Sequence, residues 1–250
     1  MNGNPWDRQE GLRERPGSPW VMRQRWEELL FLHWVWEEED LQQRLPDGLK
    51  VQTFGGKAYL GLVPFFMRGV RPRWVPAVPG VSNFLEMNLR TYVTDLSGCP
   101  GVWFFSLDCN QPLAVWTART FFHLAYFQAS MEAGGSAREG WDYRCRRAGG
   151  AEETRLHYRV RNAGIPAEPG TLDFFLVERY LLFSASPKSG KLWKGRVWHR
   201  PYALSPADQA GDVSPVFLAG GFRAPSRGPD HVAGSPGVDV WIHPLERAVP

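Results

Sequence analysis

The stretch at residues 84–107 constrains the fold of this 250-residue chain more than any other. Its first ten residues alternate between an apolar and a polar set, a period of two that is typical of a β-strand. After a short turn, residues 102–107 are apolar at nearly every position, which indicates a strand covered on both faces. Glu86, Asn88 and Arg90 form a polar row beside this buried neighbour. We expect the row to face an internal cavity; the alternative is a solvent-facing side of the strand.

Composition supports a β-rich fold with many turns. Hydrophobic residues make up 43% of the chain and aromatic residues 14%, so apolar material for a core is ample. The 21 prolines and 26 glycines favour turns over long helices. We therefore expect a mainly β fold, a single antiparallel barrel or sandwich with one or two short helices.

Charge, cysteine content and hydropathy exclude several classes of protein. A net charge of +3 is too small to indicate a nucleic-acid-binding protein. The three cysteines are odd in number and lack a CxxC spacing, which argues against a disulfide framework. The sequence shows neither a signal-peptide core nor a run of ~18 apolar residues. We expect a cytoplasmic protein that binds neither nucleic acid nor membrane, and the sequence leaves a homo-oligomer open.

The order of patterns along the chain predicts one domain after a leader. Residues 1–19 are polar and rich in Gly and Pro, so we expect them to be disordered, followed by one β-barrel domain at 20–250. A helical pattern occurs at 37–45, and 205–237 are rich in Pro, Gly and Ser and predicted to be loop. Aromatic content favours a strand over a helix at 23–36. The other predicted strands are 57–66, 84–93, 102–107, 112–119, 141–147, 154–161, 172–183, 191–198 and 238–243.

Two adjacent charges, Glu178 and Arg179, interrupt an otherwise apolar stretch. Neighbouring residues on a strand point to opposite faces, so these two side chains do not pair with each other. An unpaired buried charge is costly, and each therefore needs a partner of its own. The candidates are Arg90 or Arg119 for Glu178, and Glu86 or Asp108 for Arg179. Such contacts serve either a site or a structural ion pair.

Local motifs for catalysis or metal binding are absent from the sequence. The context of Ser82 lacks the second glycine of a nucleophile elbow, and residues 185–192 match a phosphate loop only in part. The six histidines show no HxxxH or HxH spacing, so we expect no metal and no cofactor. His199 shares strand parity with apolar neighbours, which fits a core or rim histidine as well as one that binds substrate.

Phrases spread along the chain carry a more specific signal. They are the segments 26–34 (WEELLFLHW), 45–49 (LPDGL), 63–65 (VPF), 69–73 (GVRPR), 89–93 (LRTYV), 101–108 (GVWFFSLD) and 178–180 (ERY). In this order they resemble the YqjF-like family of uncharacterised proteins. That family is similar in turn to acetoacetate decarboxylase, whose fold is an antiparallel, cone-like β-barrel around an internal cavity. The resemblance therefore implies such a barrel, and it adds Tyr180 to the candidate substrate-binding residues.

The sequence differs from acetoacetate decarboxylase at the residues that carry out its reaction. In acetoacetate decarboxylase, the family that the resemblance points to, a lysine forms the Schiff base beside a second lysine. This pair follows a strand that ends in Val-Gly-Arg. Here the matching strand ends at Arg119, and no lysine occurs between Lys57 and Lys188. Of the decarboxylase's cavity carboxylates, one matches Glu86 and the other falls at Gly61. The resemblance thus implies the chamber without its nucleophile.

Three functions fit these observations. The first is a lyase or hydratase-type enzyme acting on a small carboxylate or carbonyl compound, with Glu86 as general acid or base and Arg90 as the clamp for the anionic group. The candidate substrate-binding residues are Asn88, Arg119, Glu178, Tyr180 and His199. The second is a non-catalytic barrel that binds a small apolar or acidic ligand. The third is a structural or interaction protein, and the sequence does not decide whether the chain is an enzyme.

Overall fold

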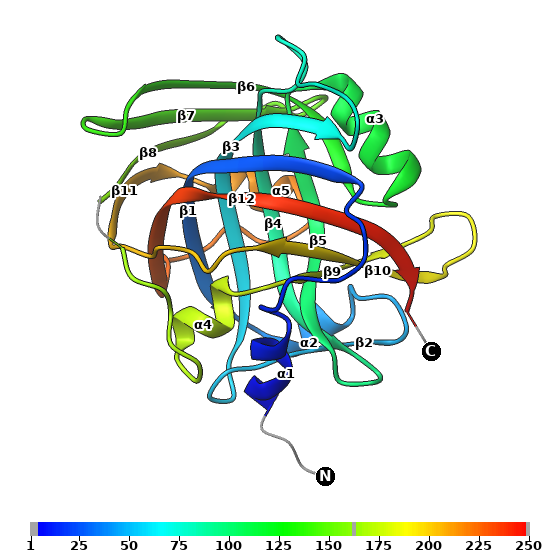
Figure 1. The fold of residues 1–250 in the computed structure, drawn as a ribbon. Helices are drawn as coiled ribbons and strands as arrows, with labels where there is room; N and C mark the ends of the chain where they lie inside the picture. Colours follow the sequence, from blue (N-terminus) through cyan, green and yellow to red (C-terminus); the bar gives the residue numbers. More distant parts are fainter. Residues whose placement is uncertain (1–4, 162–163, 249–250) are drawn as a thin grey trace.

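A closed ring of seven strands forms the body of the protein. The computed structural model describes residues 5–161 and 164–248. Each strand of the ring pairs with the next, and the ring closes where the last strand pairs with the first (Figure 1). In ring order these are β5 (Pro100–Cys109), β9 (Leu181–Ala185), β10 (Leu192–His199), β12 (His231–Arg247), β1 (Met22–Trp36), β3 (Ala58–Pro72) and β4 (Phe84–Asp95).

The sheet is mixed, so the prediction of an antiparallel barrel is right only in part. Most neighbours are antiparallel, but β5 pairs in parallel with β9 through residues 102–103. It pairs in parallel again through residues 107–109, with β6 (Tyr126–Ser136). Strand β5 therefore has different partners along its two halves, and a second layer of sheet branches from the ring at this point.

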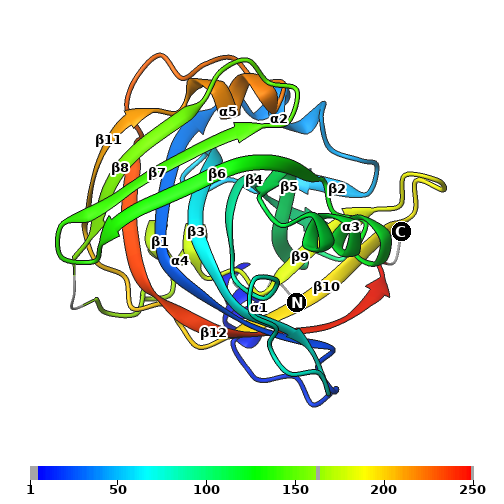
Figure 2. The same ribbon diagram turned by 90° about the horizontal axis from the view of Figure 1, so that it is seen from above.

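The second layer covers one outer side of the ring (Figure 2). It continues from β6 through β7 (Gly140–Arg147) and β8 (Thr154–Val160) to β11 (Ala207–Asp212). Apolar side chains from β1, β3 and β4 pack there against those from β6, β7, β8 and helix α5 (Ser214–Ala219). The molecule therefore has two main cores, one inside the ring and one between the ring and this layer.

Strand β4 lies between the two cores. Met87 and Leu89 belong to the outer core, whereas Phe84 and Tyr92 belong to the core inside the ring. Every residue from 84 to 93 is buried. The polar row at positions 86, 88 and 90 shares the inward-facing side of the strand, because alternate residues of a strand point the same way.

Three predicted elements differ from the structure. Residues 112–119 lie in helix α3 (Pro112–Phe121), because Gln111 caps its first turn and Pro112 fits the first helical position. The predicted strand at 172–183 begins as helix α4 (Leu172–Val177), capped by Thr171, and becomes β9 only afterwards. The predicted loop at 205–237 contains β11, α5 and the beginning of β12.

Residues 1–4 of the leader, which is predicted to be disordered, lie outside the described residues. The rest of the leader departs from that prediction, because the structure has a helix there, α1 (Pro5–Gly11), and buries Gln9 against α4 and the residue that follows it. Gln9 Nε2 donates to the carbonyls of Phe174 and Glu178, both at 2.8 Å. The other short elements are α2 (Glu38–Gln42) and β2 (Leu49–Val51). Two predictions are confirmed, the hairpin of β7 and β8 and the strand at 23–36. In the described part of the chain, no helix has the length and apolar character needed to cross a membrane.

Helix α5 offers a test of the outer core. Phe217 is fully buried against Trp34 and Trp36, with ring centres 5.0 and 5.9 Å away, whereas its neighbour Leu218 is 54% exposed. We expect Phe217→Ala to lower the free energy of unfolding by about 3–5 kcal/mol, because it leaves a cavity. Urea denaturation should show this loss. The matched change Leu218→Ala should cost less than about 1 kcal/mol, and equal losses would contradict this packing.

Candidate functional site

A pocket of about 250 Å³ lies among the strands of the ring. Its wall is mostly apolar and comes from β1, β3, β4, β5, β9, β10, β12 and helix α3. Few charged groups reach it. Glu86, Asn88 and Arg90 line it from β4, and Arg179 lines it from the segment between α4 and β9. The structure thus brings the predicted polar row together and adds a second arginine.

Glu86 is a buried carboxylic acid with defined partners. Tyr126 Oη donates to Glu86 Oε2 at 2.6 Å. Tyr143 Oη donates to the backbone carbonyl of Glu86 at 2.8 Å, which holds the strand at this point. Burial raises the pKa of Glu86 to about 7; hydrogen bonds from Tyr126 and Asn88 lower it, and the charge of Asp108 raises it further. The group can therefore gain or lose a proton near neutral pH.

Arg90 lies two polar positions further along β4 and has no carboxylate partner among the residues that the structure describes. Its Nη2 donates to the carbonyl of Leu176 at 3.2 Å, and its Nε is buried without a hydrogen-bond partner. The guanidinium carbon lies 5.7 Å from the ring centre of Phe31 and 5.8 Å from that of Tyr92. Aromatic faces thus stabilise the cation in part, while one N–H group stays unsatisfied.

Arg179 repeats this arrangement from the other side. Its Nε donates to the carbonyl of Phe175 at 2.6 Å and its Nη1 to Gln52 Oε1 at 2.7 Å, but its Nη2 has no partner. Burial lowers the pKa of Arg179 to about 9, and the charge of Arg90 lowers it further, against the effect of Tyr92. Within residues 5–161 and 164–248, no carboxylate forms an ion pair with either arginine.

The predicted partners of Arg179 are occupied elsewhere. Asp108 binds Arg147, with Oδ1 2.6 Å from Nε and Oδ2 2.8 Å from Nη2, a bidentate pair that ties the second layer to the ring. Glu86 binds Tyr126. Both predicted ion pairs of Arg179 are therefore wrong, because the chain pairs each carboxylate with a group from β6 or β7 instead.

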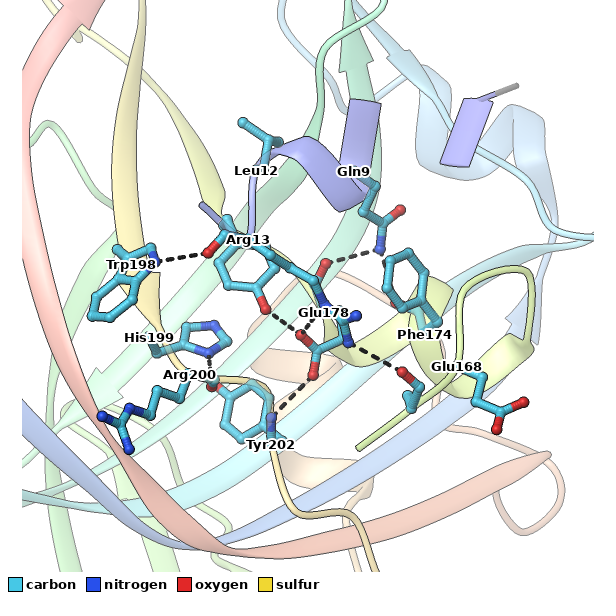
Figure 3. A network of polar contacts seen from close by, with 12 residues as sticks. Gln9, Leu12, Arg13, Glu168, Phe174, Glu178, Trp198, His199, Arg200 and Tyr202 are labelled. Carbon is cyan, nitrogen blue, oxygen red and sulfur yellow. Dashed lines mark hydrogen bonds and ion pairs between the residues drawn. The ribbon is translucent and has the colours of Figure 1, made fainter. Parts of the chain in front are cut away.

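Glu178 lies in a separate network of polar contacts with Arg13 of the leader, close to His199 (Figure 3). Glu178 is fully buried; Arg13 Nε lies 3.5 Å from its Oε2, and the backbone N–H of Tyr202 donates to its Oε1 at 3.0 Å. The Tyr180 hydroxyl donates to the same carboxylate, and the Tyr180 ring stacks on His199 with centres 4.6 Å apart. The prediction that Arg90 or Arg119 pairs with Glu178 is therefore wrong.

Of the predicted substrate-binding residues, some line the pocket and others do not. Asn88 lines the pocket, whereas Glu178, Tyr180 and His199 are buried in the network with Arg13 and do not line it. Arg119 is exposed in the last turn of α3, because the segment predicted as a strand is a helix. Sequence reasoning missed Tyr126 as the partner of Glu86, and no local pattern marks it.

The pocket holds neither a lysine nor a metal-binding cluster in the described part of the chain. None of its lining residues is a lysine, and Lys191 and Lys194 lie outside its wall. The structure also brings together no group of three or more His, Cys, Asp or Glu side chains suited to a metal ion among the residues it describes. The donor set favours recognition of an anion by guanidinium groups.

Comparisons with known proteins agree on family and fold. The model of the family DUF2071, described as an uncharacterized conserved protein, matches residues 23–239. The uncharacterized protein YqjF of Bacillus subtilis is 38% identical over 216 residues, which cover 86% of this chain and 87% of that protein.

Solved structures of the same fold are distant in sequence. An acetoacetate decarboxylase from Legionella pneumophila is 10% identical, with a TM-score of 0.64 over 96% of this chain and 94% of its own. An acetoacetate decarboxylase-like enzyme from Sphingomonas wittichii is 14% identical, with a TM-score of 0.65 over 92% and 94%. The enduracididine biosynthesis enzyme MppR, complexed with pyruvate, is 11% identical, with a TM-score of 0.62 over 94% and 93%. At these identities the likeness shows the fold.

The network around Glu178 predicts a structural role for the leader. Arg13→Ala removes the cation beside a fully buried carboxylate, and we expect it to lower the free energy of unfolding by about 1–3 kcal/mol. Arg155→Ala removes an exposed pair with Glu153 and should cost less than about 1 kcal/mol. Urea denaturation of both variants provides the comparison. Equal stability of Arg13→Ala and the unaltered chain would mean that the leader does not hold this end of the barrel.

Glu86 predicts a defined pH dependence of stability. Its pKa is raised to about 7 in the folded chain from an ordinary value of 4.5, so folding favours the protonated acid. The contribution is complete below pH 4.5 and is lost as the pH rises to about 7, a change of about 3 kcal/mol. Glu86→Gln is neutral throughout, so its stability relative to the unaltered chain should rise by that amount between pH 4.5 and 8. Parallel pH profiles in urea denaturation would contradict this.

Proposed function

Because this chain belongs to the DUF2071 family and has the fold of the acetoacetate decarboxylases, we propose that its barrel pocket is enclosed and binds a small organic carboxylate. We further propose a lyase or hydratase-type reaction there, without a Schiff-base lysine. One observation carries the proposal. Arg90 and Arg179 both line the pocket, both are buried, and neither has a carboxylate partner among the residues that the structure describes.

The two arginines favour an anion over a neutral ligand. Burying a charge without a counter-charge costs several kcal/mol of stability. A ligand that carries the opposite charge would offset this cost. A carboxylate between Arg90 and Arg179 would accept hydrogen bonds from the unpartnered Nε of one and Nη2 of the other. MppR, of the same fold, holds pyruvate, which is a small carboxylate.

Glu86 supplies the acid-base chemistry of the proposal. A group with a pKa of about 7 is present in both protonation states at neutral pH and can therefore accept or donate a proton in turn. Tyr126 orients the carboxyl group, and Asn88 lies between Glu86 and Arg90 on the same face of β4. A ligand whose carboxylate binds Arg90 would extend along this row, so that a carbon atom next to its carbonyl group lies near Glu86.

A covalent mechanism finds no support in the pocket. Its described wall contains no lysine. Burial raises the pKa of Cys109, the cysteine beside Glu86, to about 12, and the charge of Glu86 contributes, so this side chain stays a thiol. General acid-base catalysis by Glu86 is therefore the reaction class that we favour.

A second candidate is a non-catalytic barrel that binds the same class of ligand. The mostly apolar wall favours this alternative, because a hydrophobic pocket with a few charged groups is typical of a binding site as well as of an active site. The two differ in the effect of Glu86→Gln. In the enzyme this change would abolish turnover of a bound keto acid and leave its affinity nearly unchanged.

Ligand binding should depend on charge and on Arg90. We expect isovalerate, a small apolar carboxylate, to bind and to raise the thermal unfolding temperature, whereas its neutral isostere isovaleramide should bind at least tenfold more weakly. Arg90→Gln should weaken isovalerate binding at least tenfold, the size of one lost charge-assisted hydrogen bond, about 1.5–3 kcal/mol. Isothermal titration calorimetry measures both effects.

A matched control is available on α3. Arg119→Gln removes an exposed arginine that lies outside the pocket wall, and it should leave isovalerate affinity unchanged. Equal binding of isovalerate and isovaleramide, or equal losses for the two arginine variants, would contradict a carboxylate site at Arg90.

A further inference from the structure

A chain of four polar side chains connects the surface to the buried Arg90. Asp173 Oδ1 lies 2.6 Å from His231 Nε2, and His231 Nδ1 lies 2.9 Å from His33 Nδ1. His33 Nε2 then lies 2.6 Å from the Tyr92 hydroxyl. The Asp173 side chain is 53% exposed and that of His231 10%, whereas His33 and Tyr92 are fully buried. The proposed function uses Arg90 but none of these four residues.

Gly61 leaves space for the buried end of this hydrogen-bonded row of side chains, where His33 meets Tyr92. A Cβ atom at position 61 would lie 2.9 Å from His33 Cδ2 and 3.2 Å from Tyr92 Oη, closer than ordinary contacts. Any side chain at this position would therefore displace the contact between His33 and Tyr92. Here the space belongs to the histidine and the tyrosine.

When both histidines are neutral, the hydrogen bonds along these four side chains all run in one direction, from Tyr92 to Asp173. Burial lowers the pKa of His33 well below its usual value, and the charges of His231 and Arg90 act in the same sense, so His33 is neutral. Tyr92 can then donate to His33 Nε2, and His33 Nδ1–H to His231 Nδ1. His231 Nε2–H donates to Asp173. Every hydrogen in this arrangement has an acceptor.

Arg90 completes the chain on the side of the pocket. Burial raises the pKa of Tyr92, whereas the charges of Arg90 and Arg179 and a hydrogen bond from Arg90 lower it. A guanidinium has only donors, so it can donate to the Tyr92 oxygen but cannot accept the Tyr92 hydrogen. In the neutral state that hydrogen goes to His33.

A proton on His231 reverses the two bonds on the buried side of it, whereas the bond from His231 to Asp173 keeps its direction. His231 Nδ1 then carries a hydrogen and donates to His33 Nδ1, so the single hydrogen of neutral His33 must sit on Nε2 and point at Tyr92. The Tyr92 hydrogen loses its acceptor, because both of its neighbours now donate to it. The other charged groups near His231 and His33 do not change this: Asp173 already accepts from His231, and Asp230 accepts from the backbone N–H of Val35 and from Arg227.

We propose that this chain couples the pocket to solvent, so that a proton on His231 and a carboxylate beside Arg90 bind cooperatively, with the Tyr92 hydroxyl turning from His33 to the ligand. The proposal rests on the carboxylate site proposed above. A bound carboxylate supplies the acceptor that the reversed chain lacks, and its negative charge also favours the added proton. Because coupling is reciprocal, the proton must strengthen carboxylate binding by the same factor. Tyr92 lies outside the described pocket wall, so its hydroxyl contacts the ligand only in the turned position that a proton on His231 favours.

The tautomer of His33 tests the chain without any ligand. ¹⁵N NMR distinguishes hydrogen on Nδ1 from hydrogen on Nε2. As the pH falls from about 8 to 5, the range in which histidines in general gain charge, we expect His33 to stay neutral and to move its hydrogen from Nδ1 to Nε2. Asp173→Asn should shift this change to lower pH, because it removes the carboxylate that stabilises charged His231.

A surface pair elsewhere provides the matched control. Asp142 lies 2.9 Å from His157 Nδ1 on the second layer, and Asp142→Asn should affect His157 alone. Gly61→Ala should separate His33 from Tyr92 and so uncouple the His33 tautomer from His231. If His33 keeps its hydrogen on Nδ1 over this whole pH range, or becomes charged within it, the proposed hydrogen-bonded chain is wrong.

Calorimetry then tests the coupling to the ligand. Glu86 also titrates near neutral pH, so the experiment uses Glu86→Gln to remove its contribution. We expect this variant to bind isovalerate about threefold or more tightly at pH 6 than at pH 8, and to take up a proton on binding; adding Asp173→Asn should reduce the ratio to below about 1.5. Failure of isovalerate to bind at either pH would contradict the carboxylate site itself. Binding with the same affinity at both pH values and no proton uptake would refute only the coupling.

Discussion

Strand β4 is buried on both faces, and the position of the pocket groups depends on this constraint. One face packs against the second layer of sheet, so the strand cannot rotate or slip by one residue without moving Met87 and Leu89 out of an apolar core. The opposite face must then point inward along its whole length. Glu86, Asn88 and Arg90 are held in the barrel because the apolar side of the same strand is fixed outside it.

The protein treats its buried charges in two different ways. Where a charge holds the fold together, it has a partner of opposite sign: Asp108 with Arg147 between the ring and the second layer, and Glu178 with Arg13 at the end closed by the leader. The two arginines of the pocket have carbonyl, amide and aromatic contacts but no carboxylate among the described residues. The contrast distinguishes these structural ion pairs from the two pocket arginines, for which we propose a counter-charge supplied by a ligand.

The same barrel can support different chemistry because the wall residues change while the strands do not. The decarboxylase fold is retained at 10% identity, yet no lysine lines the described wall of this pocket. Glu86 remains, with a pKa raised by burial into the range needed for proton transfer. Gly61 lies beside the contact between His33 and Tyr92, and a side chain at this position would displace that contact.

The sequence by itself determined that residues 84–93 form a strand and that Glu86, Asn88 and Arg90 share one face of it, while the structure decided that this face points into the barrel. The alternation at residues 84–93 is a local pattern, and a period of two requires one face to be buried as a unit, so Glu86, Asn88 and Arg90 could be placed together without coordinates. Local pattern failed at Arg119, since capping by Gln111 and Pro112 outweighs a strand-like alternation.

Only the tertiary structure decided which charges meet. Glu178 pairs with Arg13 from a leader that reads as disordered, and His33 reaches Asp173 through His231 from the far end of the chain. Such partners are chosen by the closure of the barrel, which brings distant segments together. The spacing of residues along the sequence does not reveal these pairs, because the energy of a buried charge depends on the groups that surround it in space.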